Sequence, residues 1–170
     1  MLAMDCGRQL MPEYQDRPQA FLDEVILPAL AGLAVDADAK AASQLLLGTA
    51  IQESNLHYRR QLGDGPARGL FQMEPATHND IWTNYLAYQA GLAAKVRGFL
   101  GGAAQSADAL ETNDRYAAAM ARVHYRRVPA ALPPVGDINA MGAYWKQYYN
   151  TPAGHGTAAQ FVTNWRRYFP

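Results

Sequence analysis

Helical periodicity is the sequence feature that most restricts the fold of this chain. Apolar residues recur at spacings of three and four along most of its 170 residues, and no segment shows the strict alternation typical of a β-strand. The pattern predicts a mainly α fold with helices over about 17–34, 36–55, 76–100, 114–127, 138–149 and 157–169.

Polar residues and prolines mark the ends and bends of these helices. Pro28 predicts a bend in the first helix, and Asp36 or Asp38 is suited to cap the second. Each cap has a short side-chain oxygen that can accept a hydrogen bond from a free N–H of the first turn. The expected caps of the next three helices are Thr77, then Thr112 or Asn113, then Asp137.

One segment, 57–72, breaks the helical pattern. Its sequence, HYRRQLGDGPARGLFQ, holds three glycines and a proline, which predicts turns and at most a small β-hairpin. Two further stretches, 101–109 and 129–136, are typical of loops and connections. No repeat or low-complexity tract divides the chain, so we expect one domain over 1–170, with 1–16 as an N-terminal extension.

Charge, cysteine and histidine content argue against a nucleic-acid partner, a disulfide and a bound metal. Because 15 basic and 15 acidic residues cancel to a net charge of zero, we expect no nucleic-acid partner. Cys6 is the only cysteine, which rules out an internal disulfide. The four histidines stand far apart and lack the spacing of a zinc motif, so we expect no metal and no cofactor.

Hydropathy favours a protein without a stable membrane insertion. The longest apolar run, VILPALAGLAV, is too short to span a bilayer and contains Pro28. The first residues, MLAMDCGRQLMPEYQDRP, have no apolar core of signal-peptide length. We therefore expect synthesis in the cytoplasm without a signal peptide.

Glu53 occupies an unusual position at the end of the second predicted helix. Leu46, Ala50 and Glu53 are spaced by four and three, so they share one helix face, and the carboxyl extends an apolar stripe. Desolvation and the negative end of the helix dipole both disfavour the anion and raise the pKa. A carboxylic acid that stays protonated near neutral pH can donate a proton to a leaving oxygen.

Two motifs around Glu53 carry a resemblance to known families. ESN at 53–55, followed by GPARGLFQMEPAT at 65–77, resembles the lysozyme-like lytic transglycosylases and the goose-type lysozymes. Those families have a Glu-Ser pair at a helix end and then a Gly-Leu-Met-Gln motif, in which Phe71 here replaces the methionine. The resemblance covers about residues 45–80.

The resemblance implies a lysozyme-like α-helical domain with a cleft and a glycosidase that acts on peptidoglycan. The substrate would be the glycan strand, cut between N-acetylmuramic acid and N-acetylglucosamine. Glu53 would be the general acid, Ser54 would orient it or bind sugar, and Gln72 would bind substrate from across the cleft. The families' third motif, Ala-Tyr-Asn, points to Tyr125 in ARVHYRR as a substrate-binding residue, although the asparagine is missing; Tyr149, followed by Asn150, is the alternative.

The second carboxylate decides between two reactions. Inverting hydrolysis needs a second acid to activate water, whereas the related transglycosylases use the sugar's own 6-hydroxyl and leave a 1,6-anhydro end. Asp64 is the first candidate because goose-type lysozymes carry a similar Gly-Asp, Glu74 is the second and Asp80 the third. We expect a lysozyme (muramidase), with lytic transglycosylase as the alternative.

Proteins of two other classes remain as alternatives. One is a non-catalytic virion or cell-wall-binding module with a lysozyme-like fold, against which the intact Glu53, Ser54 and Gln72 argue. The other is a zinc amidase, against which the scattered histidines argue. Together with the missing signal peptide, the resemblance suggests a bacteriophage endolysin or virion enzyme, a monomer or part of a virion, that reaches the bacterial cell wall through a holin or with the virion.

Overall fold

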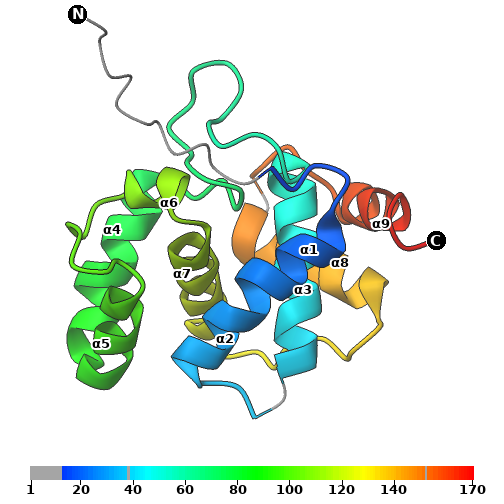
Figure 1. The fold of residues 1–170 in the computed structure, drawn as a ribbon. Helices are drawn as coiled ribbons and strands as arrows, with labels where there is room; N and C mark the ends of the chain where they lie inside the picture. Colours follow the sequence, from blue (N-terminus) through cyan, green and yellow to red (C-terminus); the bar gives the residue numbers. More distant parts are fainter. Residues whose placement is uncertain (1–12, 38, 152) are drawn as a thin grey trace, which may run out of the picture.

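Helices make up most of the structure, a computed structural model that describes residues 13–37, 39–151 and 153–170 (Figure 1). Cys6 and Asp38, which entered the sequence predictions, lie outside these residues. The α-helices are α1 (Pro18–Phe21), α2 (Leu27–Leu33), α3 (Ala39–Ser54), α4 (Pro75–Asn84), α5 (Ala90–Gly98), α6 (Ala109–Thr112), α7 (Asp114–Arg126), α8 (Ile138–Trp145) and α9 (Ala158–Arg166). Three tighter or wider helical segments join them: η1 (Leu22–Ile26), η2 (Leu86–Tyr88) and η3 (Lys146–Asn150).

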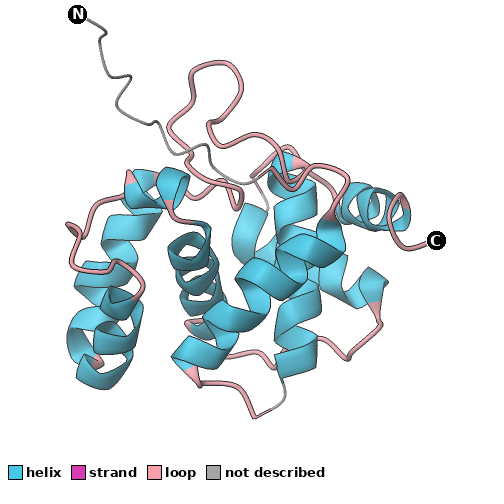
Figure 2. Ribbon diagram, viewed as in Figure 1, coloured by secondary structure: helices cyan, strands magenta, loops and turns pink. Residues whose placement is uncertain are grey.

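The mainly α prediction is confirmed, but the described residues form no β-strand (Figure 2). Over 57–72, where the sequence predicts turns and at most a small hairpin, two isolated antiparallel bridges pair Arg60 with Arg68 and Arg68 with Met73. Gly63, Asp64 and Gly69 have positive φ angles, which interrupt the extended conformation that a paired strand needs. The segment is therefore a loop held by turns.

The first predicted helix consists of α1, η1 and α2, which follow one another directly, and its hydrogen-bond register changes at η1. The segment η1 is a π-helical turn, in which the Leu27 N–H bonds to the carbonyl of Leu22. Pro28 follows directly, and it has no N–H to give to the carbonyl of Glu24. The wider turn before the proline accommodates that missing bond within the helix.

The long helix predicted over 76–100 is wrong. The chain instead forms α4, η2 and α5, separated at Tyr85 and Gln89, whose backbone angles are not helical. These breaks turn the chain so that Leu86 and Leu92 are both buried. The helix also begins at Pro75 with Glu74 at its N-cap, so Thr77 lies inside the first turn instead of capping it.

Two of the expected caps are confirmed. The side chain of Asn113 accepts a hydrogen bond from the Tyr116 N–H, and that of Asp137 accepts one from the Ala140 N–H. The carboxylate of Asp36 instead forms a buried ion pair with Arg122 in α7, in which the guanidinium nitrogens Nε and Nη2 donate to Oδ2 and Oδ1. This pair ties the connection after α2 to the middle of α7.

The helix α3 is the central element, because α7, α8 and α9 all pack against it together with the N-terminal helices. Its buried residues are Ala42, Ser43, Leu45, Leu46, Leu47, Gly48, Thr49, Ala50, Ile51 and Ser54, which cover nearly every side of the helix. At Gly48 an added Cβ would lie 2.2 Å from the ring of Phe161, so only glycine lets α9 approach this closely.

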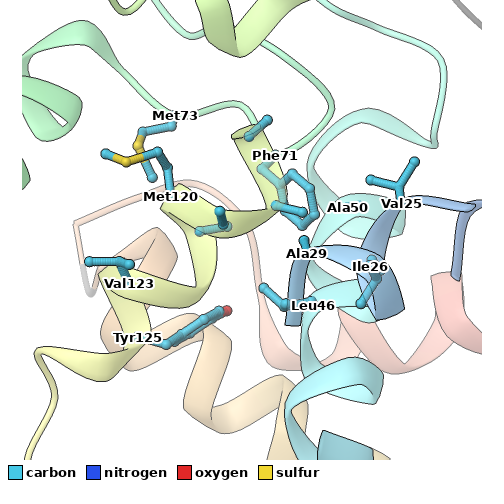
Figure 3. Packing of buried hydrophobic residues seen from close by; sticks show 14 of the residues in the cluster. Val25, Ile26, Ala29, Leu46, Ala50, Phe71, Met73, Met120, Val123 and Tyr125 are labelled. Carbon is cyan, nitrogen blue, oxygen red and sulfur yellow. The ribbon is translucent and has the colours of Figure 1, made fainter. Parts of the chain in front are cut away.

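The loop between α3 and α4 contributes to the same core. Figure 3 shows Phe71 and Met73 among side chains from η1 and α2, from α3 and from α7. Tyr14, inside the predicted N-terminal extension 1–16, is also buried and stacks edge-on against Phe21. Within the described residues, no helix is long and apolar enough to cross a bilayer.

Gly69 seats the loop against α6, and this contact yields a prediction. Gly69 has a φ of +72°, and an added Cβ would lie 2.1 Å from the carbonyl oxygen of Leu110. Gly63 has a similar φ of +75°, but its Cβ would meet nothing within 4 Å. We expect Gly63→Ala to lower the unfolding free energy by about 1–2 kcal/mol, from backbone strain alone. Gly69→Ala should cost about 1–3 kcal/mol more because the backbone of α6 must also move.

Chemical denaturation of the two variants provides the measurement. Equal losses of unfolding free energy in the two variants would show that the loop does not rest on α6 as described.

Candidate functional site

A cavity of about 660 Å³ opens beside the end of α3. Its wall comes from four separate parts of the chain: Glu53 of α3, residues of the 58–77 segment, His124 of α7 and residues of 148–156. The tight packing of α7, α8 and α9 on α3 brings these parts together. The site therefore depends on the tertiary fold, although Glu53 is positioned by its own helix.

The Glu53 carboxyl is closely surrounded by protein while part of the residue remains open to the cavity. Burial raises the pKa of this carboxyl from its usual value of 4.5 to about 7, and a hydrogen bond from Trp145 opposes the rise. The donor is the indole Nε1–H, 2.8 Å from Glu53 Oε1. At neutral pH a large fraction of the carboxyl groups is consequently protonated, as a general acid requires.

Of the acids considered as the second carboxylate, one lies at the cavity. Among the described residues, Glu53 and Glu74 are the acids that line it. Asp64 is exposed in the loop, at a positive φ of 60°, and does not line the cavity. Asp80 is bound to Arg127 through an ion pair of 2.6 Å and also lies outside the cavity wall. The geometry thus favours Glu74 over Asp64 as the second acid.

Ser54 and Gln72 both hold the loop that borders the cavity. The buried hydroxyl of Ser54 lies 2.7 Å from the carbonyl oxygen of Leu70. The Gln72 amide nitrogen donates to the carbonyls of Tyr58 and Gly69, at 3.1 and 2.9 Å. Gln72 lines the cavity and Ser54 does not, so of the two only Gln72 is placed to touch a ligand.

The two candidate tyrosines lie next to each other, with ring centroids 5.2 Å apart. Tyr125 is buried below the cavity, and its hydroxyl bonds to Thr49 at 2.7 Å. Tyr149 lines the cavity and donates its hydroxyl hydrogen to the carbonyl oxygen of Phe71, at 2.7 Å. The structure therefore places the alternative, Tyr149, at the cavity wall and gives Tyr125 a position in the core.

Two residues of the site had no role in the sequence predictions. Trp145 ends α8, and nothing in its local sequence, AYWKQYY, indicates a contact with Glu53. His124 lines the cavity and accepts at Nδ1 from Arg127, 2.8 Å away. Burial lowers the pKa of His124 to about 4, so its ring is neutral near pH 7. Trp145 lies in a helix without charged residues, whereas His124 lies in the charged helix α7, and neither local sequence points to the cavity.

The described residues contain no group of three or more His, Cys, Asp or Glu side chains that could hold a metal ion. The chemistry that the cavity offers with its own side chains is proton transfer: one buried, partly protonated acid, one exposed acid, and tyrosine and amide groups around them.

The buried carboxyl predicts a pH-dependent stability. Because the folded-state pKa of Glu53 is raised from 4.5 to about 7, its favourable contribution is complete below pH 4.5 and is lost as pH rises to about 7. The loss amounts to roughly 3 kcal/mol of unfolding free energy. Gln is nearly isosteric and uncharged, so Glu53→Gln should be more stable than the wild type at pH 8, by up to this amount, and nearly equal to it at pH 4.

Urea denaturation at both pH values measures the difference. The matched control is Glu13→Gln, at an exposed glutamate outside the cavity wall, which should follow the wild type. If Glu53→Gln showed the same pH dependence as the control, the carboxyl would not be buried as described.

Comparison of the chain with models of known protein families, with curated proteins and with solved structures finds no match.

Proposed function

We propose that this protein is a glycosidase that cleaves the glycan strands of peptidoglycan, with Glu53 as the general acid. The observation that carries the proposal is the Glu53 carboxyl at the cavity wall, with its pKa raised to about 7 by burial. Protonation of a glycosidic oxygen needs such an acid, because an ordinary glutamate has lost its proton at neutral pH. The resemblance of residues 45–80 to lysozyme-like enzymes supplies the substrate class and the lysozyme-like fold as part of the proposal.

The bond cut is the one between N-acetylmuramic acid and N-acetylglucosamine, and the strand lies in the cavity between the 58–77 segment and residues 148–156. Polar groups on both sides, including Gln72 and Asn150, suit a sugar chain that presents hydroxyl and amide groups. Cleavage passes through an oxocarbenium-like state while Glu53 gives its proton to the leaving oxygen.

We assign hydrolysis to the enzyme, with Glu74 as the base that activates water. Glu74 is exposed at the cavity wall, so its carboxylate is accessible to the water molecule that it would activate. A buried acid and a solvated base at the same cavity are the two environments that divide the acid and base roles between paired carboxylates. Asp64, the first choice from the sequence, does not line the cavity, which supports Glu74 over it.

Lytic transglycosylase is the second candidate. It is favoured by the difference between the two acids: Trp145 holds the Glu53 carboxyl by a hydrogen bond, while within the described residues no side-chain hydrogen bond positions Glu74. In that reaction the 6-hydroxyl of the sugar replaces water, and the second carboxylate is not needed.

Removal of the acid proton should abolish activity. We expect Glu53→Gln to lower the rate of cell-wall lysis by about 10²–10⁴-fold, the usual contribution of general acid catalysis. Glu13→Gln should retain the wild-type rate. Lysis is measured as clearing of purified peptidoglycan, and circular dichroism confirms the fold. A folded Glu53→Gln variant that keeps most of its activity would disprove the assignment.

The products and a pair of matched variants decide the reaction type. We expect mass spectrometry of digested peptidoglycan to show reducing muramic ends, Glu74→Gln to lose at least about 10²-fold in rate, and Asp64→Asn to remain near the wild type. Only 1,6-anhydro ends, lighter by one water, together with a mild effect of Glu74→Gln, would establish the transglycosylase reaction. A severe loss in Asp64→Asn alone would instead restore Asp64 as the base.

A further inference from the structure

The indole of Trp145 is the hydrogen-bond partner that the described residues provide for the Glu53 side chain. Its Nε1–H donates to Oε1 over 2.8 Å, and the two residues are 92 positions apart in the chain. Across residues 13–37, 39–151 and 153–170, Oε2 has no hydrogen-bond partner. One oxygen of the carboxyl is therefore held by the protein, and the other is left for whatever enters the cavity.

The indole itself is held on several sides. Trp145 is 1% exposed, and its ring stacks at 33° to that of Phe161, with centroids 5.7 Å apart. On another side, a Cβ added to Gly156 would lie 2.5 Å from the Cη2 atom of the indole. Contacts from α9 and from the segment before it therefore restrict the orientation of the ring and the direction of its N–H.

An indole N–H can only donate a hydrogen bond. The protonated carboxyl has one carbonyl oxygen, a good acceptor, and one hydroxyl oxygen, which carries the proton. The bond from Trp145 is therefore strongest when Oε1 is the carbonyl oxygen, and this puts the proton on Oε2. After the proton has left, the same bond stabilises the carboxylate, which carries charge on both oxygens.

We propose that Trp145 is a positioning residue of the active site, which holds Oε1 as an acceptor and thereby places the acid proton on Oε2, the oxygen facing the leaving group. This inference rests on the proposed role of Glu53 as general acid. The proton passes from Oε2 to the glycosidic oxygen as the bond to that oxygen breaks, and the electron pair left on Glu53 is shared by an oxygen that already accepts from the indole.

The contact can be tested in the wild-type protein. The indole Nε1–H resonance of Trp145, assigned in ¹⁵N-labelled protein by its loss in Trp145→Phe or by through-bond experiments, should shift with pH as Glu53 titrates, with a midpoint near 7. In Glu53→Gln the resonance should stay constant over the same range. An indole resonance that does not respond to pH in the wild type would overturn the proposal, whether or not Trp145→Phe folds.

The positioning role is tested with Trp145→Phe, which keeps an aromatic ring against Phe161 but removes the donor. Its matched control is Trp82→Phe, which removes another buried indole bond, to the Tyr116 hydroxyl at 3.0 Å, outside the cavity wall. At pH 5 Glu53 is protonated in all these proteins, so a fall in kcat there reports on the placement of the proton. We expect kcat at pH 5 to fall roughly 10- to 100-fold in Trp145→Phe and to stay near the wild type in Trp82→Phe.

The pH profile separates positioning from a general structural loss. Without the indole bond, the pKa of Glu53 should rise further, so the fall in rate at alkaline pH should begin at a higher pH. The ratio of the variant's activity to that of the wild type should therefore increase between pH 5 and pH 8. A ratio that is the same at both values, or an unchanged kcat at pH 5, would overturn the proposal.

A separate readout distinguishes this failure from that of the proposed function. Retained activity in Glu53→Gln would disprove the role of Glu53 as general acid, and with it the proposed function. If instead Glu53→Gln is inactive and carbon-detected titration shows the same Glu53 pKa in Trp145→Phe as in the wild type, the general acid stands and the positioning role of Trp145 is disproved.

Discussion

Desolvation of one carboxyl group is the constraint on which the candidate site depends. Glu53 ends a helix that is covered on nearly every side, and the pKa of the group is raised to about 7 because protein replaces most of its water. A helix in the middle of a core provides such an environment, whereas a helix on the surface leaves its last turn solvated. The burial of α3 by α7, α8 and α9 is thus connected directly with the acid chemistry proposed for its C-terminal end.

Much of the fold was predictable from local patterns, since helical periodicity located the helices and polar residues located the Asn113 and Asp137 caps. The errors have physical causes. The 76–100 helix is broken because burial of Leu86 and Leu92 outweighs the helical preference of the intervening residues. Asp36 has a typical capping side chain, but the distant Arg122 provides a stronger, charged partner.

The site was predictable to the extent that it is local. Glu53 could be identified because its position at a helix end and the neighbouring motif both depend on residues close to it in the sequence. Spacing could not tell which of Asp64 and Glu74 lies at the cavity, because the path of a loop with several positive φ angles does not follow from a local pattern. Trp145 could not be identified from the sequence for another reason: it meets Glu53 through a tertiary contact, and a single sequence carries no record of such a pairing.

The distance along the chain between Glu53 and Trp145 has a consequence for how the protein is made. Their 92-residue separation gives the site a high contact order, and the indole takes its place only when Phe161 of α9 packs behind it. During synthesis, α3 leaves the ribosome long before α8 and α9 exist to enclose its end. A nascent chain therefore carries Glu53 before the residues that bury it and bond to it have been made, and the environment of this carboxyl is complete only once α8 and α9 have packed against α3.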